Sequence, residues 1–278
     1  MPRSLTPQEK QEAKQVWPRL DVEAVVVTDE KTRNYNCLAW TFGITTSWVW
    51  PWGSRNATKT EFDVLYRSKG FTPAGAGEIA AFGLNLGSMT HGSISGPGHG
   101  PRWESKCGAW LRIQHGLGEL EGGALYGNAL GFYTHSASAG PTIASGRTAL
   151  KAMKLEEVEI DAIQQAVRAV PEETRTRFTA AYRAWVETWE HPLVIVSSNP
   201  SDRAQSTQFL DLVSLGPQIL PLLIERLATS DEFFALQALD RLLPTSHIVA
   251  LELEDPRVLG GEQERALLSV KRWVAANL

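Results

Sequence analysis

The sequence contains few cysteines, little excess charge and no long apolar run. It has two cysteines, Cys37 and Cys107, so a disulfide framework is not expected and a reducing compartment is the natural setting. The formal net charge is −4, whereas proteins that bind a nucleic-acid backbone usually carry a basic excess. No run of about 18 apolar residues indicates a membrane-spanning helix. We therefore expect no nucleic-acid partner and no membrane partner.

An apolar signal segment is also missing from the first residues, MPRSLTPQEKQEAKQ. Secretion signals need an apolar stretch of about 7–15 residues after a basic start. We therefore expect a cytoplasmic protein, or one that is exported by a route that needs no such signal.

Tryptophan is abundant in the first part of the chain. Seven of the ten tryptophans precede residue 111, and three of them stand in the run Trp48-Val49-Trp50-Pro51-Trp52. Large aromatic side chains mostly fill cores, and they also line ligand clefts. The run therefore predicts either an aromatic core or an aromatic wall beside a cleft.

Composition changes near residue 148, which predicts two domains, residues 1–147 and 148–278, with the boundary in or shortly after Ser136-Ala137-Ser138-Ala139-Gly140-Pro141. The first part has short apolar runs bounded by glycine, which are typical of strands. Its expected helices are residues 8–16, a segment starting at Cys37, and residues 59–69. Its expected strands are residues 78–84, 88–95, 101–106 and 109–115, with residues 21–28 a strand or a loop. This order predicts an α+β fold with a cysteine-bearing helix on an antiparallel sheet.

The second part has helical periodicity. Its expected helices are residues 155–170, 172–190, 208–215, 218–228 and 232–243, with a break and a short extended run at residues 191–200. Gly216-Pro217 marks the end of one helix and the start of the next. The segment from Phe209 to Leu242 resembles HEAT-type helical hairpins, which present extended surfaces to protein partners.

The segment Tyr35-Asn36-Cys37-Leu38-Ala39-Trp40 carries the candidate chemistry. Asn36 is a good N-cap residue, so Cys37 is expected in the first turn of a helix. The dipole and the free N–H groups there favour a thiolate, which is the reactive form of cysteine. The backbone N–H of Cys37 would also be available to an oxyanion.

A thiolate nucleophile requires a base and a group that orients the base. His91 fits the first role best, because it lies in a strand-like run of small residues, Met89 to Ser95. For the second role the following strands offer Glu104, Ser105 and His115.

The motif order YNCLAW, GEIAAFG, THGSIS and RWESK resembles the papain-like NlpC/P60 and CHAP amidase superfamily over about residues 30–133. It also resembles an uncharacterised bacterial group with an NC-apolar-AW signature. The resemblance implies that Cys37 is the nucleophile, His91 the base and Glu104 the orienting acid. It further implies an oxyanion or substrate site at Tyr35 and Asn36. The chain departs from the family at Asn36-Cys37-Leu38, where Asp-Cys-Ser or Gln-Cys-Thr is usual.

Three functions follow from these residues. The first is a cysteine-dependent hydrolase of amide bonds in a peptide or protein, which works through a thioester and needs no cofactor. The second is a catalytically silent papain-like fold that binds a protein partner through its C-terminal helices. In this case Cys37 is a buried small hydrophobe and His91 a structural histidine. The third is an acyltransferase that uses the same thiolate. A zinc site at the two cysteines is not expected, because no CxxC or HxxxH spacing accompanies them.

Overall fold

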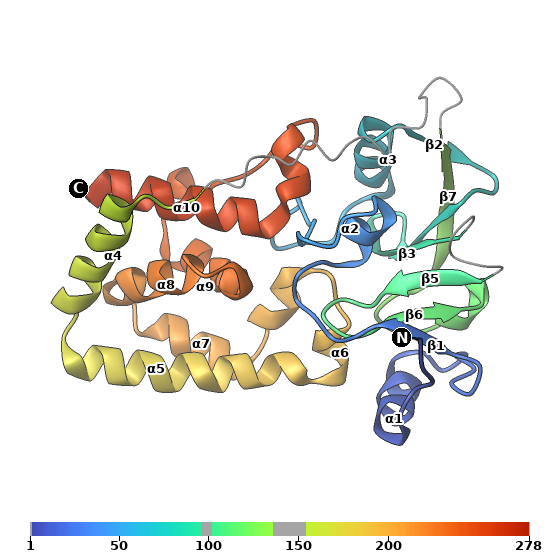
Figure 1. The fold of residues 1–278 in the computed structure, drawn as a ribbon, viewed down its shortest axis with the longest axis horizontal. Helices are drawn as coiled ribbons and strands as arrows, with labels where there is room; N and C mark the ends of the chain where they lie inside the picture. The colour runs from blue at the N-terminus through green and yellow to red at the C-terminus, as the bar shows by residue number, and fades with distance from the viewer. Residues whose placement is uncertain (1, 96–101, 136–153, 278) are drawn as a thin grey trace.

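A computed structural model describes residues 2–95, 102–135 and 154–277. Figure 1 shows a β-sheet half on the right and a helical half on the left, with α2 and α6 close to the junction between them. The C-terminus lies at the far end of the helical half, whereas the N-terminus lies in the sheet half, beside β1 and β6. The predicted α+β class with an antiparallel sheet is confirmed.

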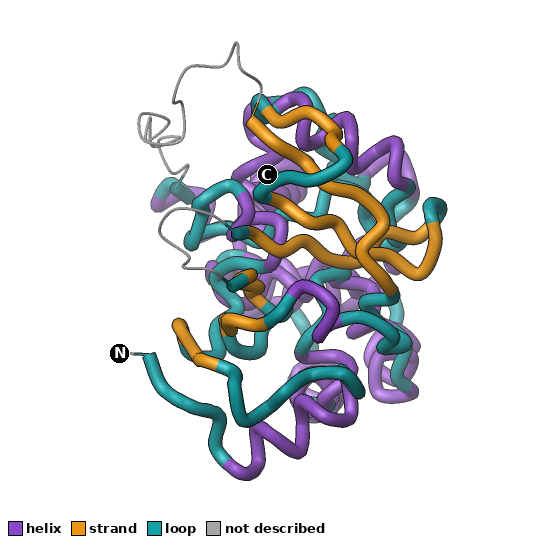
Figure 2. Tube along the Cα trace, turned by 90° about the vertical axis from the view of Figure 1, so that its right-hand side faces the viewer, coloured by secondary structure: helices purple, strands orange, loops and turns teal. Residues whose placement is uncertain are grey.

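One seven-stranded antiparallel sheet has the order β1-β6-β5-β4-β3-β7-β2. Its strands are β1 (Val26–Asp29), β2 (Phe71–Ala74), β3 (Ile79–Asn85), β4 (Ser88–Ile94), β5 (Trp103–Lys106), β6 (Arg112–His115) and β7 (Asn128–His135). The strands β3 and β4 form a hairpin. In Figure 2 the strands run across the face turned to the viewer, with helices behind them. The sheet centre thus brings β4 and β5, which carry His91 and Ser105, into neighbouring positions.

Three helices of the first half begin at capping residues that the sequence makes recognisable. They are α1 (Pro7–Val16), α2 (Cys37–Thr41) and α3 (Lys59–Ser68). Thr6 and Thr58 form capping boxes with Glu9 and Glu61, and each box satisfies two N–H groups at a helix start. These three predicted helices are confirmed.

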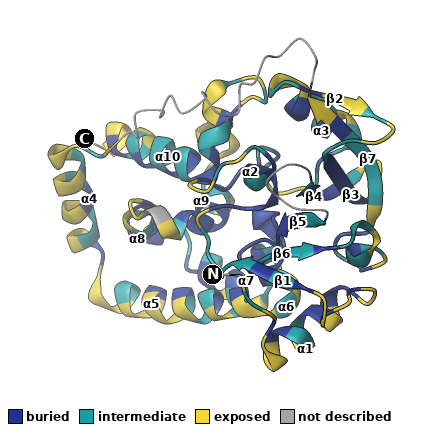
Figure 3. Ribbon diagram, turned by 45° about the vertical axis from the view of Figure 1, so that its right-hand side comes forward, coloured by how far each residue is buried: buried dark blue, intermediate teal, exposed yellow. Residues whose placement is uncertain are grey.

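The second half is made of helices and short 3-10 segments. They are α4 (Glu157–Ala169), α5 (Glu172–Glu187), η2 (Thr188–Glu190), α6 (Pro192–Ile195), η3 (Pro200–Ala204), α7 (Thr207–Ser214), η4 (Pro217–Ile219), α8 (Leu220–Leu227), η5 (Ser230–Ala235), α9 (Leu236–Leu242), η6 (Thr245–His247), η7 (Pro256–Gly260) and α10 (Gly261–Asn277). Gly216 has φ +77°, so the predicted glycine stop after α7 is confirmed. In Figure 3 the outer faces of α4 and α5 are largely exposed. A HEAT-type arrangement of these helices stays a prediction.

Two strands, β2 and β7, and the helix α10 were not predicted from the sequence. An extended run was predicted for residues 191–200, where α6 and the start of η3 are found. Proline is well placed at the first turn of a helix, and Pro192 and Pro200 open these two segments. The predicted domain boundary at residues 136–141 lies outside the described residues.

A tryptophan joins the two halves. The Trp48 ring lies 5.7 Å from the Phe233 ring and 5.0 Å from the Phe234 ring, measured between centroids. Its backbone N–H donates to Gln263 Oε1 at 2.7 Å, and its carbonyl accepts from the Glu262 N–H at 2.8 Å. Trp48 is fully buried, so at this position the run of tryptophans forms core.

No single helix in the described ranges is long and apolar enough to cross a membrane. The helical segments Thr207–Ser214 and Pro217–Leu227 are long and apolar enough only when they are taken together, and they are bent by 90° relative to each other.

Candidate active site

Cys37 is the first residue of α2, and Asn36 is its N-cap as predicted. The Asn36 side-chain oxygen accepts from the N–H groups of Ala39 and Val49, both at 3.2 Å. Its NH2 group donates to the Val49 carbonyl at 2.9 Å. Asn36 therefore fixes the start of the helix and the adjoining chain, and these contacts occupy the amide that the sequence analysis assigned to the oxyanion site.

The Cys37 sulfur is surrounded by hydrogen-bond donors. The Ser198 hydroxyl donates to it at 3.1 Å, and the nearby backbone N–H groups of Gly92, Leu38 and Cys37 itself also lower the pKa of its thiol. These donors favour the thiolate. Burial has the larger effect, because Cys37 is 0% exposed, and it raises the pKa of the thiol to about 11. In this conformation Cys37 is therefore an un-ionised thiol at neutral pH.

His91 lies in β4, immediately before Gly92, whose backbone N–H lowers the pKa of the Cys37 thiol. Its Nε2 lies 3.0 Å from the Ser105 hydroxyl, which in turn lies 2.8 Å from His115 Nε2. His115 Nδ1 lies 2.8 Å from the Gly116 carbonyl, and Ser93 Oγ lies 2.5 Å from Ser105 Oγ. Two histidines and two serines on β4, β5 and β6 thus form one buried chain of hydrogen bonds.

The acceptor at one end of this chain of hydrogen bonds determines which ring nitrogen of each histidine carries a proton. A carbonyl can only accept, so His115 carries its proton on Nδ1 and offers a lone pair on Nε2. Ser105 must then donate to His115 and accept from His91 Nε2–H and from Ser93. A neutral His91 with its proton on Nε2 has a lone pair on Nδ1. That atom is buried and has no hydrogen-bond partner in the described part of the chain.

Burial keeps both rings neutral. It lowers the pKa of His91 well below its usual 6.5, with a further effect of the nearby His115, and it lowers the pKa of His115 to about 4. The His91 ring also stacks on Tyr126, with 4.0 Å between centroids. The ring is thus held on one face by Tyr126 and at Nε2 by Ser105, while Nδ1 is left as an unused base.

Glu104 has other partners than His91. Its carboxylate accepts from the Thr28 hydroxyl and lies 3.3 Å from Arg112 Nε. Successive residues of a strand point to opposite faces, so Ser105 and not Glu104 lies on the face of His91. The geometry therefore favours Ser105 and His115, the alternatives left open by the sequence, over Glu104 as the group that orients His91.

Tyr35 is buried, and its phenol is engaged away from the sulfur. It donates to Asp29 Oδ2 at 2.5 Å and accepts from Arg112 at 3.3 Å. Burial, with a smaller effect of Asp29, raises the pKa of this phenol. The expected contribution of Tyr35 to an oxyanion site therefore has no geometric support.

A segment from the helical half covers the sulfur. We call residues 195–199 the strap. Its carbonyls at Ile195, Val196 and Ser198 accept from the Ala109 N–H at 2.7 Å, the Tyr126 hydroxyl at 2.8 Å and Trp48 Nε1 at 2.8 Å, respectively. Gly108, with φ +53°, permits the close approach, because a Cβ there would lie 2.5 Å from the Ile195 carbonyl oxygen.

Ser198 is 161 residues from Cys37 in the sequence, and no local motif connects the two. The same holds for Tyr126, which contacts both His91 and the strap. Sequence reasoning therefore missed both residues, and only the folded arrangement reveals them.

Cys107 is buried, and burial raises the pKa of its thiol to about 12. The neighbouring Lys106 Nζ donates to the carbonyls of Gly108 and Trp110, each at 2.6 Å. Within residues 2–95, 102–135 and 154–277, no group of three or more His, Cys, Asp or Glu residues is placed to hold a metal ion.

A family model described as "Domain of unknown function (DUF7689)" matches residues 26–134. No curated protein and no solved structure matches the chain. The matched range starts with β1 and ends one residue before the end of β7, so it includes Cys37, His91, Ser105 and His115. Over its sheet half, the chain is similar to this family.

Proposed function

We propose that the first half of the chain is a papain-like cysteine hydrolase of amide bonds, held closed by the strap. The observation that carries this proposal is the buried, unpartnered Nδ1 of His91 in β4, the strand that packs against α2, whose first residue is Cys37. A buried polar atom without a partner is costly and calls for an explanation, and a catalytic role is one such explanation.

In this proposal the Cys37 proton passes to His91 Nδ1, and the thiolate attacks the amide carbonyl carbon. The backbone N–H of Cys37 donates to the oxyanion that forms. The imidazolium then gives its proton to the leaving amine, and a water molecule hydrolyses the thioester with His91 as the base. Ser105 and His115 act as positioning residues, because they fix the proton of neutral His91 on Nε2.

The strap has to leave the sulfur before a substrate can enter. Its departure frees three hydrogen-bond donors, at Ala109, Tyr126 and Trp48. Donors that stay unpaired in a closed site cost about 1–3 kcal/mol each. A peptide offers carbonyl groups that could take the place of the strap carbonyls, which supports a peptide or protein substrate.

A second function has its own supporting observation. Cys37 is fully buried with a raised pKa, as expected for a small core residue in a catalytically silent fold. In that case the exposed outer faces of α4 and α5 would bind a protein partner.

Opening the strap distinguishes the two functions. In Gly108→Ala, the new Cβ collides with the Ile195 carbonyl and should displace the strap from Cys37. Gly53→Ala is the matched control, because Gly53 has φ +64° and open space around its Cβ position. We expect iodoacetamide to alkylate Cys37 much faster in Gly108→Ala than in wild type or Gly53→Ala. If Cys37 stays unreactive in a folded Gly108→Ala protein, the silent fold is the better account.

A further inference from the structure

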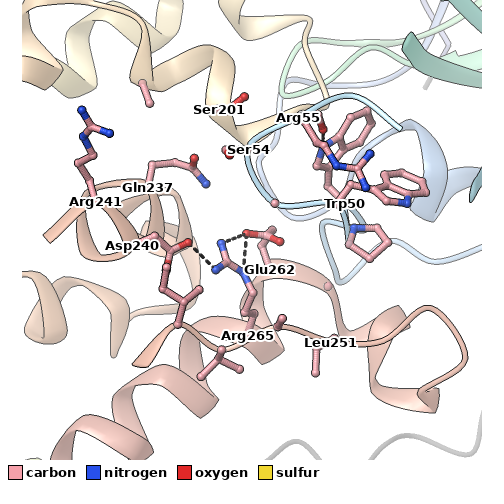
Figure 4. A pocket seen from close by; sticks show the side chains of 18 of the residues that line it. Trp50, Ser54, Arg55, Ser201, Gln237, Asp240, Arg241, Leu251, Glu262 and Arg265 are labelled. Carbon is pink, nitrogen blue, oxygen red and sulfur yellow. Dashed lines mark hydrogen bonds and ion pairs between the residues drawn. The ribbon is translucent and has the colours of Figure 1, made fainter. Parts of the chain in front are cut away.

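A cavity of about 770 Å³ lies between the loop of residues 50–55 and the helical half. Figure 4 shows Trp50 and Arg55 on one side, Gln237 and Asp240 on the other, and Glu262 and Arg265 between them. Its volume is in the usual range of ligand sites, about 300–1,000 Å³. Neither Cys37 nor His91 is among its lining residues.

Two carboxylates share one guanidinium in this cavity. Arg265 Nε and one of its NH2 groups donate to Glu262 Oε2, at 3.1 and 2.7 Å. The other NH2 group donates to Asp240 Oδ2 at 2.7 Å. The second oxygen of each carboxylate accepts no hydrogen bond from the described residues. The cluster therefore has an excess of one negative charge and two free acceptor oxygens.

Gln237 adds a third free acceptor. Its side chain is 7% exposed and makes no hydrogen bond within the described ranges. In Figure 4 it extends from its helix into the space beside Asp240 and Ser201. Its amide atoms are not among the fully buried, unpartnered atoms of the described residues, so they face the cavity and are open to a ligand that supplies donors.

The remaining walls suit a flat cation on an apolar stem. Trp50 and Trp52 border the cavity with 1% and 8% of their surface exposed, and Leu251 and Val258 add aliphatic borders. Among the cavity's other cations, Arg55 is neutralised by Glu61 at 2.5 Å, and Arg241 is exposed, so solvent screens its charge.

We propose that this cavity binds an arginine-type group, an alkyl guanidinium held by Asp240, Glu262 and Gln237 and packed against tryptophan. A guanidinium has five N–H donors in one plane and stacks on aromatic rings. It therefore matches three acceptor oxygens and an aromatic wall better than a compact ammonium does. The group is either a small free guanidinium compound or an arginine side chain of a peptide. The proposal does not depend on Cys37 chemistry.

Titration calorimetry on the full chain tests the proposal with N-acetyl-argininamide, the free small guanidinium agmatine and a short arginine-containing peptide. N-acetyl-citrullinamide is the matched neutral probe, because a urea replaces the guanidinium in the same shape. We expect the arginine probe to bind at least about tenfold more tightly than the citrulline probe, as a lost charged hydrogen bond implies. Agmatine binding as tightly as the peptide indicates a free ligand, and tighter peptide binding indicates a side chain.

The variant Gln237→Leu should weaken binding of the arginine probe about tenfold. It should not reduce stability, because Gln237 has no partner to lose. The control Gln11→Leu changes an exposed glutamine on α1 and should leave binding unchanged. The proposal is overturned if the arginine probe does not bind at about 10 mM, a level that detects even millimolar affinity. Equal binding of the two probes, or unchanged binding in a folded Gln237→Leu protein, would overturn it as well.

Discussion

At the scale of single residues, the Ser105 hydroxyl decides which nitrogen of His91 is available. It donates to His115, and it must therefore accept from His91 Nε2. The Gly116 carbonyl determines the direction of these hydrogen bonds. It accepts from His115 Nδ1–H, so His115 Nε2 must accept from Ser105. One backbone carbonyl thus determines the tautomer of the candidate base.

The tautomers can be measured directly. Nitrogen-15 NMR should find the neutral His91 proton on Nε2 and the neutral His115 proton on Nδ1. In Ser105→Ala both Nε2 atoms lose their partner, so we expect His91 to exchange between tautomers and the free energy of unfolding to fall by about 1–3 kcal/mol. Ser214→Ala, on the exposed surface, is the control. A wild-type His91 proton on Nδ1 would contradict the proposed role of this residue.

Burial of neutral His115 makes stability depend on pH. The folded pKa is about 4 and the unfolded value is 6.5, so below pH 6.5 the unfolded chain binds a proton that the folded chain does not. Stability is therefore lost as pH falls from 6.5 towards 4, by roughly 2 kcal/mol at pH 5 for this one residue. Urea unfolding at pH 7 and pH 5 should show a smaller difference between the two pH values in His115→Gln. An equal difference in both proteins would rule out this coupling.

At the scale of elements, the sequence predicted what is local and missed what is not. The first turns of α1 and α3 follow from capping boxes four residues long, so both helices were predictable. Whether Glu104 or Ser105 faces His91 depends on the side of the sheet to which each residue of β5 points. A shift of one residue in the predicted strand exchanges the two sides. β7 was missed because Gly131 interrupts its pattern. A Cβ at residue 131 would lie 2.4 Å from the Lys59 side chain.

The strap is held by contacts that can be removed singly. Tyr126→Phe deletes the hydroxyl that donates to the Val196 carbonyl and keeps the ring that stacks on His91. One net hydrogen bond contributes about 0.5–1.5 kcal/mol, so we expect alkylation of Cys37 to accelerate up to about tenfold. Mass spectrometry of iodoacetamide-treated protein gives the rate. An unchanged rate would mean that this contact does not hold the strap.

At the scale of the whole molecule, a backbone contact joins the two halves at the start of α10. Gly261 has φ +64°, and a Cβ at this position would lie 2.3 Å from the Trp48 carbonyl oxygen. The sequence could not reveal this contact, because Trp48 and Gly261 are far apart in the chain and α10 itself was overlooked. At the same residue, Trp48, the two halves also share buried tryptophan and phenylalanine rings.

The junction should be sensitive to one methyl group. We expect Gly261→Ala to lower the free energy of unfolding by about 3 kcal/mol or more. The cost of placing alanine in the left-handed region adds to the cost of the collision between its Cβ and the Trp48 backbone. Gly216→Ala is matched in φ, at +77°, but has open space around its Cβ position. It should cost only about 1 kcal/mol. Equal losses in urea unfolding would show that the Gly261–Trp48 contact is not tight.

The central claim is that Cys37 and His91 form a reactive pair once the strap is displaced. The most direct test is the pH dependence of Cys37 alkylation in Gly108→Ala, with and without His91→Gln. We expect Cys37 to react well below about pH 8, the usual range of a free thiol, and His91→Gln to abolish this low-pH reactivity. If Cys37 follows an ordinary thiol titration whether or not His91 is present, there is no such pair, and the hydrolase proposal fails.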